Sequence, residues 1–213
     1  MTDFLYPFIE ADERDAAGLL ADLARSAEAK AAESARLRTA TLDAAAPELD
    51  AAAAAMAGRF AAGGRLFAFG NGGSATDAAS VVALFLRPPW GRPLPARSLA
   101  AETAVLTALG NDVGFDLVFS RQLIAHARAG DVAVGLSTSG NSENLLVAFA
   151  EARRRGLLTV GLAGYDGGRM AASPDVDHCL VVRADSVHRI QETQAALAAA
   201  LWAGVQSALG EAP

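Results

Sequence analysis

From Gly64 onward, short apolar runs alternate with helical patterns, and each run is followed by a turn rich in glycine or serine. The runs are nearly continuous in apolar residues, which is typical of strands that are buried on both faces. Strands that alternate with helices predict a parallel sheet covered by helices on both sides. We therefore predict an α/β fold, a three-layer αβα sandwich with N-terminal helices. The predicted strands are residues 65–69, 95–99, 132–136, 157–163 and 178–182.

The first 62 residues have a different pattern, dominated by alanine, arginine, glutamate and leucine, which are good helix formers. We predict two helices here, with a break near Asp43 and a second helix that starts at Pro47, because proline is tolerated in a first turn. Residues 1–43 are predicted to form an N-terminal arm and helix, and residues 44–213 the main domain. The apolar segment Phe4–Ile9 is expected to dock on this fold or on another subunit.

Composition excludes several classes of function. The only lysine is Lys30, so the chain has no Gly-Lys-Ser/Thr phosphate loop of the kind that many nucleotide hydrolases use. The formal net charge of −6 argues against binding nucleic acid through a basic face. The single cysteine, Cys179, excludes an internal disulfide and a metal site built from several thiolates of one chain. The sequence has no long apolar run and no signal peptide, and we expect a cytoplasmic protein with no membrane partner.

Two of the turns follow predicted strands and lead into predicted helices, which is where parallel sheets bind ligands. The turn Ser137–Ser142 contains three serines, one threonine and one glycine, so hydroxyls and backbone N–H groups meet at the positive end of a helix dipole. Such a site binds anions, and phosphate is the anion that we expect. The alternative is that these residues only cap the helix, which requires one hydroxyl and not four.

The other turn, Gly70–Ser74, has the glycine spacing of a dinucleotide-binding loop. That function also requires an acidic residue about 20 residues later, at the end of the next strand. The sequence has Pro93–Arg97 in that region, and the first acidic residue, Glu102, comes later. We therefore expect no nucleotide cofactor.

Five segments with a fixed order and spacing are more specific than either turn alone. They are Gly70–Ala78, Gly110–Phe115, Leu136–Ser142, Gly164–Gly168 and Arg189–Glu192. Together they resemble the sugar isomerase (SIS) domain, and more closely its phosphoheptose isomerase branch, which converts sedoheptulose 7-phosphate to a heptose 7-phosphate. The resemblance implies a phosphorylated sugar as the ligand, a homotetramer built through the helices, and active sites shared between neighbouring subunits.

The resemblance also implies two sets of substrate-binding residues. One set holds the sugar phosphate, and the other contacts the rest of the substrate. The first set is Ser137, Thr138, Ser139 and Ser142, and the second is Asn71 and Ser74.

The sequence departs from the resembled branch at its usual catalytic positions. The branch has a glutamate ten residues after the loop serine and a histidine eight residues after the motif glutamine, and here these positions are Leu84 and Ala199. Neither side chain can transfer a proton, whereas interconversion of an aldose and a ketose requires a base and an acid. Zinc-binding members add a histidine where this sequence has Ser80. Only Gln191 remains of the four ligand positions, so we expect no metal and place Gln191 in the substrate-binding set.

Two titratable residues remain as catalytic candidates. Glu102 stands where the branch usually has an aspartate near the substrate, and its carboxylate is one methylene longer. His188 stands where related enzymes have an aspartate, although a polar histidine in a first helical turn is the simpler interpretation. Gln194 is expected either to line the pocket or to bond across a subunit interface.

Two functions are consistent with these residues. The first is an aldose–ketose isomerase of a phosphorylated sugar that works through Glu102, with His188 as a second group. The second is a non-catalytic oligomeric scaffold or sensor that keeps the phosphosugar pocket and binds a protein partner. The resemblance includes a precedent for the second, a tetrameric bacterial relative that binds the replication initiator DnaA and lacks the catalytic pair.

Overall fold

The computed structural model describes residues 16–212. The segment Phe4–Ile9 lies outside the described residues. The chain divides between Arg36 and Leu37 into two compact units. In the described part of the first unit every residue is helical, and the second unit contains the sheet.

The second unit is built around a sheet of five parallel strands. They are β1 (Leu66–Gly70), β2 (Ala96–Ser98), β3 (Val132–Ser137), β4 (Leu158–Gly164) and β5 (His178–Val182). Their order in the sheet is β2-β1-β3-β4-β5. Every residue of β1, β3 and β4 is buried, as the continuous apolar runs predict. The prediction of a parallel sheet is confirmed.

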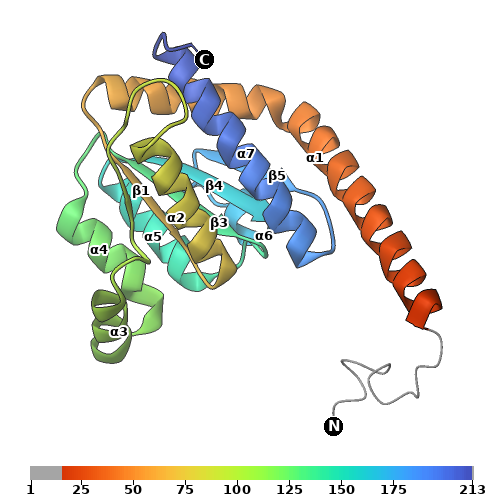
Figure 1. Ribbon diagram of the computed structural model, residues 1–213. Helices are drawn as coiled ribbons and strands as arrows, with labels where there is room; N and C mark the ends of the chain where they lie inside the picture. The colour runs from red at the N-terminus through yellow and green to blue at the C-terminus, as the bar shows by residue number, and fades with distance from the viewer. Residues whose placement is uncertain (1–15, 213) are drawn as a thin grey trace. The chain divides into compact units, whose positions relative to one another are not determined.

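Helices cover both faces of this sheet and complete the predicted three-layer sandwich (Figure 1). The helical elements of the described residues are α1 (Ala16–Ala61), α2 (Gly73–Leu86), α3 (Thr103–Asp112), the 3₁₀ turn η1 (Phe115–Leu117), α4 (Val118–His126), α5 (Glu143–Arg154), α6 (Gly168–Ala171) and α7 (Val187–Ala208). On one face, α2, α7 and the C-terminal part of α1 share an apolar core that contains Phe85 and Trp202. On the other face, α4 and α5 share a core that contains Phe119 and Phe149. No helix within residues 16–212 is both long enough and apolar enough to span a bilayer.

The two predicted N-terminal helices are one continuous helix, so the predicted break between Asp43 and Pro47 is wrong. Pro47 lies inside α1, where it has no N–H for the carbonyl of Asp43 and its ring crowds that carbonyl, at a cost of about 3 kcal/mol. Packing of the following turns offsets this cost. Leu49 and Met56 are buried in the core, and burial of one such side chain contributes roughly 1.5–3 kcal/mol.

We expect Pro47→Ala to stabilise the protein by about 1–3 kcal/mol. Alanine restores the donor for the carbonyl of Asp43, and the exposed position requires no repacking. Urea denaturation followed by circular dichroism measures the change. The control is Pro89→Ala, in the exposed loop between α2 and β2, which is expected to lower stability slightly because the unfolded chain gains freedom. Unchanged or reduced stability of Pro47→Ala would contradict this account of α1.

Candidate functional site

The carboxyl ends of β1 and β3 lie side by side, because these parallel strands pair with Gly70 opposite Leu136. The chain leaves the two strands toward opposite faces of the sheet, since α2 packs on one face and α5 on the other. Open α/β sheets bind ligands in the crevice outside the strand ends at such a point. Both turns that were singled out in the sequence begin here.

Three serine hydroxyls cluster in the segment 137–142, here called the serine loop, at the N-terminus of α5. The Oγ of Ser137 lies 3.2 Å from the Oγ of Ser142 and 3.5 Å from the Oγ of Ser139. It also accepts a hydrogen bond from the N–H of Gly140 at 3.1 Å. Ser137 is buried and the other two serines are half-buried, so the cluster has one closed side and one open side. Hydroxyls at the positive end of a helix dipole are suited to an anion.

The alternative that these hydroxyls only cap α5 does not fit this geometry. Ser142 is the N-cap residue, but its side chain makes no hydrogen bond to the first turn of the helix. Its hydroxyl pairs with that of Ser137. In the first turn of α5, the N–H of Leu145 donates to the carbonyl oxygen of Ser142 at 3.1 Å. Without a side-chain cap, the N–H groups of Glu143 and Asn144 are available to a ligand.

Glycines allow the serine loop to pack against the loop that follows β4. Gly140 has a φ of +64°, and a Cβ added there would collide with the carbonyl oxygen of Gly167. A Cβ added to Gly168 would lie 2.5 Å from the carbonyl oxygen of Ser139. The N–H of Met170 donates to the carbonyl oxygen of Gly140 at 2.9 Å. Backbone contacts that leave no room for a side chain therefore fix the position of the serine loop.

Asn71, directly after β1, is joined to Asn144 in the first turn of α5. Their side-chain amides form two reciprocal hydrogen bonds, each 2.9 Å long. The structure therefore brings Asn71 beside the serine loop, as the substrate-binding prediction requires. Ser74 is in the first turn of α2 and only 5 % exposed, so little of its side chain is open to a ligand. Sequence reasoning missed Asn144, although its place two residues after the serine loop was a signal.

Gln191 connects α7 to the start of α2. Its Nε2 donates to Oδ2 of Asp77 at 2.9 Å. A Cβ added to Gly73 would collide with the Gln191 amide, so this side chain lies directly against the loop after β1. Gln191 is half-buried and lies on the Asn71 side of the crevice.

The sequence pattern of the SIS domain matches residues 31–164, which is more than half of the chain. The chain belongs to the SIS domain family. The phosphoheptose isomerase of Sulfurimonas denitrificans is 52 % identical over 126 residues, which cover 58 % of this chain and 64 % of the relative. The match therefore spans less than two thirds of that relative. The phosphoheptose isomerase of Rhodospirillum rubrum is 43 % identical over 168 residues, which cover 77 % of this chain and 87 % of the relative.

Solved structures agree with this assignment. Phosphoheptose isomerase GmhA from Neisseria gonorrhoeae superposes with a TM-score of 0.80 at 38 % identity, covering 87 % of this chain and 99 % of that chain. A phosphoheptose isomerase from Francisella tularensis also gives 0.80, at 29 % identity, covering 86 % of this chain and 97 % of that chain. Within the SIS family, the chain therefore belongs to the phosphoheptose isomerase branch.

The two candidate catalytic residues of this SIS domain are exposed. Glu102 lines a hollow between α2 and β2, and no residue of the serine loop lines that hollow. It is the N-cap residue of α3, but its side chain makes no capping hydrogen bond. His188 lies in the first turn of α7. Within residues 16–212, no hydrogen bond or ion pair joins either residue to the serine loop.

The positions at which zinc-binding members of the branch have ligands do not form a metal site here. The hydroxyl of Ser80 donates to the carbonyl of Thr76 within α2, and Leu84 packs against the apolar core. The amide of Gln191 is bonded to Asp77. No three His, Cys, Asp or Glu side chains of residues 16–212 are grouped so that they could hold a metal ion. These residues do not fit zinc, and we derive no chemical step through a metal.

Gln194 is completely buried in α7. It therefore neither lines the pocket nor reaches another subunit, and both expectations for it are wrong. Its Nε2 donates to the carbonyl oxygen of Leu162 at 3.1 Å and lies 3.5 Å from that of Ser137. The apolar pattern of the helix predicts that this side chain faces the core, but it does not predict which strands the buried amide contacts.

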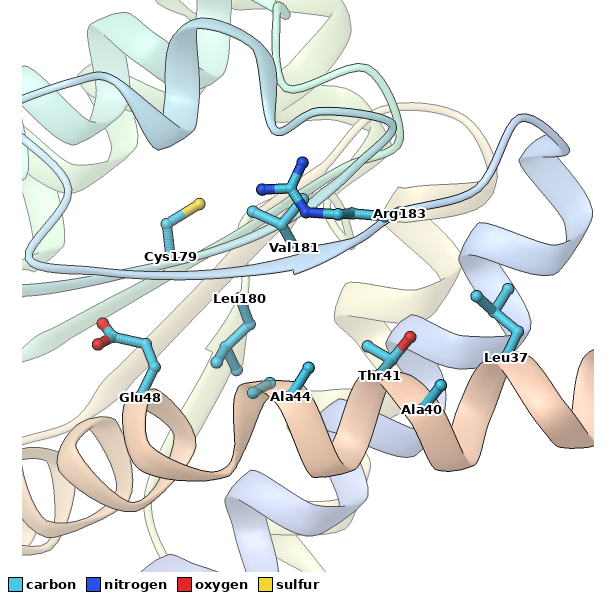
Figure 2. Close-up of a pocket in the computed structure, with 10 residues that line it drawn as sticks. Leu37, Ala40, Thr41, Ala44, Glu48, Cys179, Leu180, Val181 and Arg183 are labelled. Atoms are coloured by element: carbon cyan, nitrogen blue, oxygen red, sulfur yellow. The ribbon is translucent and has the colours of Figure 1, made fainter.

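A separate hollow of about 380 Å³ lies between α1 and the edge strand β5 (Figure 2). Leu180 points toward the helix and Cys179 points away from it. The Oε1 of Glu48 lies 2.9 Å from Nδ1 of His178, which ties α1 to the strand. Burial, with a smaller contribution from the Glu48 carboxylate, raises the pKa of Cys179 to about 11. The thiol is therefore protonated at neutral pH and is not a candidate nucleophile.

Proposed function

We propose that this protein binds a phosphorylated sugar, with the phosphate held by Ser137, Thr138, Ser139 and Ser142. The hydroxyl cluster at the N-terminus of α5 carries the proposal, because its serines turn toward one another and not toward the helix. Asn71 and Gln191 approach the same crevice from β1 and α7 and would contact the sugar. Relatives named phosphoheptose isomerase favour a seven-carbon sugar, and sedoheptulose 7-phosphate is the ligand to test.

In this proposal, the protein binds the sugar phosphate but does not isomerise it by the usual reaction of the branch. Isomerisation moves a proton between adjacent carbons and between oxygens, and side chains of suitable pKa within reach must carry it. Leu84 is packed against the core and Ala199 has only a methyl group, so neither position supplies such a group. A pocket that keeps its phosphate contacts but lacks both groups retains affinity and loses rate.

One observation favours turnover as a second candidate function. The Glu102 carboxylate is exposed and lines an open hollow of about 330 Å³. In a homotetramer with shared sites, a neighbouring subunit would bring its own substrate-facing residues toward such a surface. Glu102 would then act as the base, with His188 as the second proton-transfer group.

The non-catalytic function implies a partner. We propose a cytoplasmic homotetramer that presents the occupied or empty sugar pocket to another protein, as a scaffold or sensor. Size-exclusion chromatography with light scattering tests the tetramer. A monomeric protein at micromolar concentration would contradict the shared active sites, and Glu102 would then have no proposed role in catalysis.

Calorimetric titration with sedoheptulose 7-phosphate, with product analysis of the same samples, separates these functions. We expect binding without product, and about 10- to 100-fold weaker binding by Ser139→Ala because a hydrogen bond to a charged group is lost. Ser80→Ala is the matched control, since its hydroxyl is committed to the carbonyl of Thr76 on α2. If Ser139→Ala binds as well as wild type, the serine loop is not the phosphate site.

Product formation would support the second candidate, provided that Glu102→Gln abolishes it. Glutamine keeps the shape of the side chain and removes its capacity as a base. Turnover that persists in Glu102→Gln would contradict the proposed role of this residue. Absence of any heat with the sugar phosphate would contradict the binding proposal itself.

A further inference from the structure

Gln194 has a polar side chain at a position that is surrounded by the apolar core. The residue is 0 % exposed and belongs to the side of α7 that contributes Ile190, Leu197 and Leu201 to the apolar core. Its Oε1 is buried and has no hydrogen-bond partner among the described residues. Burying an unpaired carbonyl oxygen costs free energy, so the amide is not explained by packing alone.

The donor end of this amide contacts two strand ends. Nε2 donates to the carbonyl oxygen of Leu162 at 3.1 Å and to that of Ser137 at 3.5 Å. Leu162 belongs to β4, whereas Ser137 is both the last residue of β3 and the first of the serine loop. Gln194, which is completely buried, therefore contacts the serine loop from the core.

The contact with Ser137 fixes the orientation of a backbone donor in the serine loop. The carbonyl of Ser137 and the N–H of Thr138 belong to one planar trans peptide, in which C=O and N–H point in opposite directions. A carbonyl directed toward Gln194 in the core therefore turns the Thr138 N–H away from the core. Thr138 is half-buried, so part of this residue is open to a ligand.

We propose that Gln194 is a positioning residue, which orients the N–H of Thr138 toward the phosphate of the bound sugar. This inference rests on the proposed function, because it assumes that the serine loop binds phosphate. Gln194 does not touch the ligand, and it acts only through the peptide between Ser137 and Thr138. The contact should increase the affinity for any phosphate monoester, and inorganic phosphate is the smallest ligand that tests it.

The test compares Gln194→Met with wild type in calorimetric titrations with inorganic phosphate and sedoheptulose 7-phosphate. Methionine has similar length and no donor, and we expect both dissociation constants to rise about three- to tenfold, the effect of one lost hydrogen bond. The matched control is Thr193→Val, the adjacent residue on α7, which is buried and whose hydroxyl has no partner among the described residues. Thr193→Val is expected to bind as wild type does.

Amide NMR spectra distinguish positioning from a general loss of structure. Phosphate should shift the Thr138 N–H resonance in wild type and in Thr193→Val, and shift it much less in Gln194→Met. Should Gln194→Met fail to fold, the side-chain NH₂ resonances of Gln194 in wild type give the same test, since they should shift when phosphate binds. Unchanged Gln194 resonances, or equal affinities in all three proteins, would overturn the inference while leaving phosphate binding intact. No binding by wild type would instead contradict the proposed function.

Discussion

Gly140→Ala is expected to reduce phosphate affinity at least about 100-fold and to destabilise the fold by about 2–4 kcal/mol. The added Cβ collides with the carbonyl oxygen of Gly167, a backbone atom that cannot turn aside as a side chain would. The φ of +64° adds about 1–2 kcal/mol for any residue with a Cβ. Relief of the collision requires the serine loop to leave the loop after β4. Calorimetric titration with inorganic phosphate and urea denaturation measure the two effects.

Gly130→Ala separates backbone strain from the collision. Gly130 also has a positive φ, +92°, but a Cβ added there meets no atom within 4 Å. It lies just before β3, at the end of the sheet opposite to the serine loop. We expect a loss of about 1 kcal/mol and unchanged phosphate affinity. Normal phosphate binding by Gly140→Ala, or an equal loss in Gly130→Ala, would show that the contact between the two loops does not shape the site.

The strands were predictable because their signal is local. A run such as Val132–Ser137 is apolar at almost every position, and the structure places the strand within one residue of the predicted bounds. Pro47 gave an equally local signal, which was misleading. Whether a proline breaks a helix depends on what the following turns bury, and the core that Leu49 and Met56 join is formed by residues distant in the sequence. In α1, tertiary packing therefore outweighs the low helix propensity of proline.

The site was predictable in part, for a related reason. The composition of the serine loop predicts an anion site without knowledge of the fold. The bonds from Asn71 to Asn144 and from Gln194 to Ser137 depend on which strands are neighbours. Although β2 lies between β1 and β3 in the sequence, it pairs at the outer edge of β1, so β1 and β3 are adjacent. That order could not be read from the apolar pattern, and Asn144 was therefore missed and Gln194 misassigned.

Strand order also decides what the position of Glu102 means. The residue follows β2, the edge strand, and the serine loop follows β3, with β1 between them. A carboxylate after an edge strand is open to solvent and to a neighbouring molecule. Substrate contact through Glu102 therefore depends on the proposed homotetramer, so oligomeric state and activity should be measured on the same preparation.

Asp131→Ala is expected to cause the largest loss of stability, about 3–5 kcal/mol, because several hydrogen-bond donors lose one shared buried acceptor. Asp131 is fully buried, and its carboxylate accepts hydrogen bonds from the N–H and guanidinium of Arg65, each 2.9 Å long. It accepts a third, at 3.0 Å, from the N–H of Arg128. Alanine leaves these donors without their acceptor at the point where β1 and β3 begin. Urea denaturation measures the loss.

Two further variants connect this loss to the site. Asp131→Asn keeps an acceptor of the same shape and should lose less, about 1–3 kcal/mol. Glu143→Ala removes an exposed ion pair with Arg169, and it should change stability by no more than about 0.5 kcal/mol. Because Asp131 holds the amino ends of the same strands whose carboxyl ends carry Asn71 and Ser137, the folded fraction of Asp131→Asn should still bind phosphate normally. Weaker binding by folded Asp131→Asn would mean that the pairing of β1 with β3 is set from this end, and not by the contacts around the serine loop.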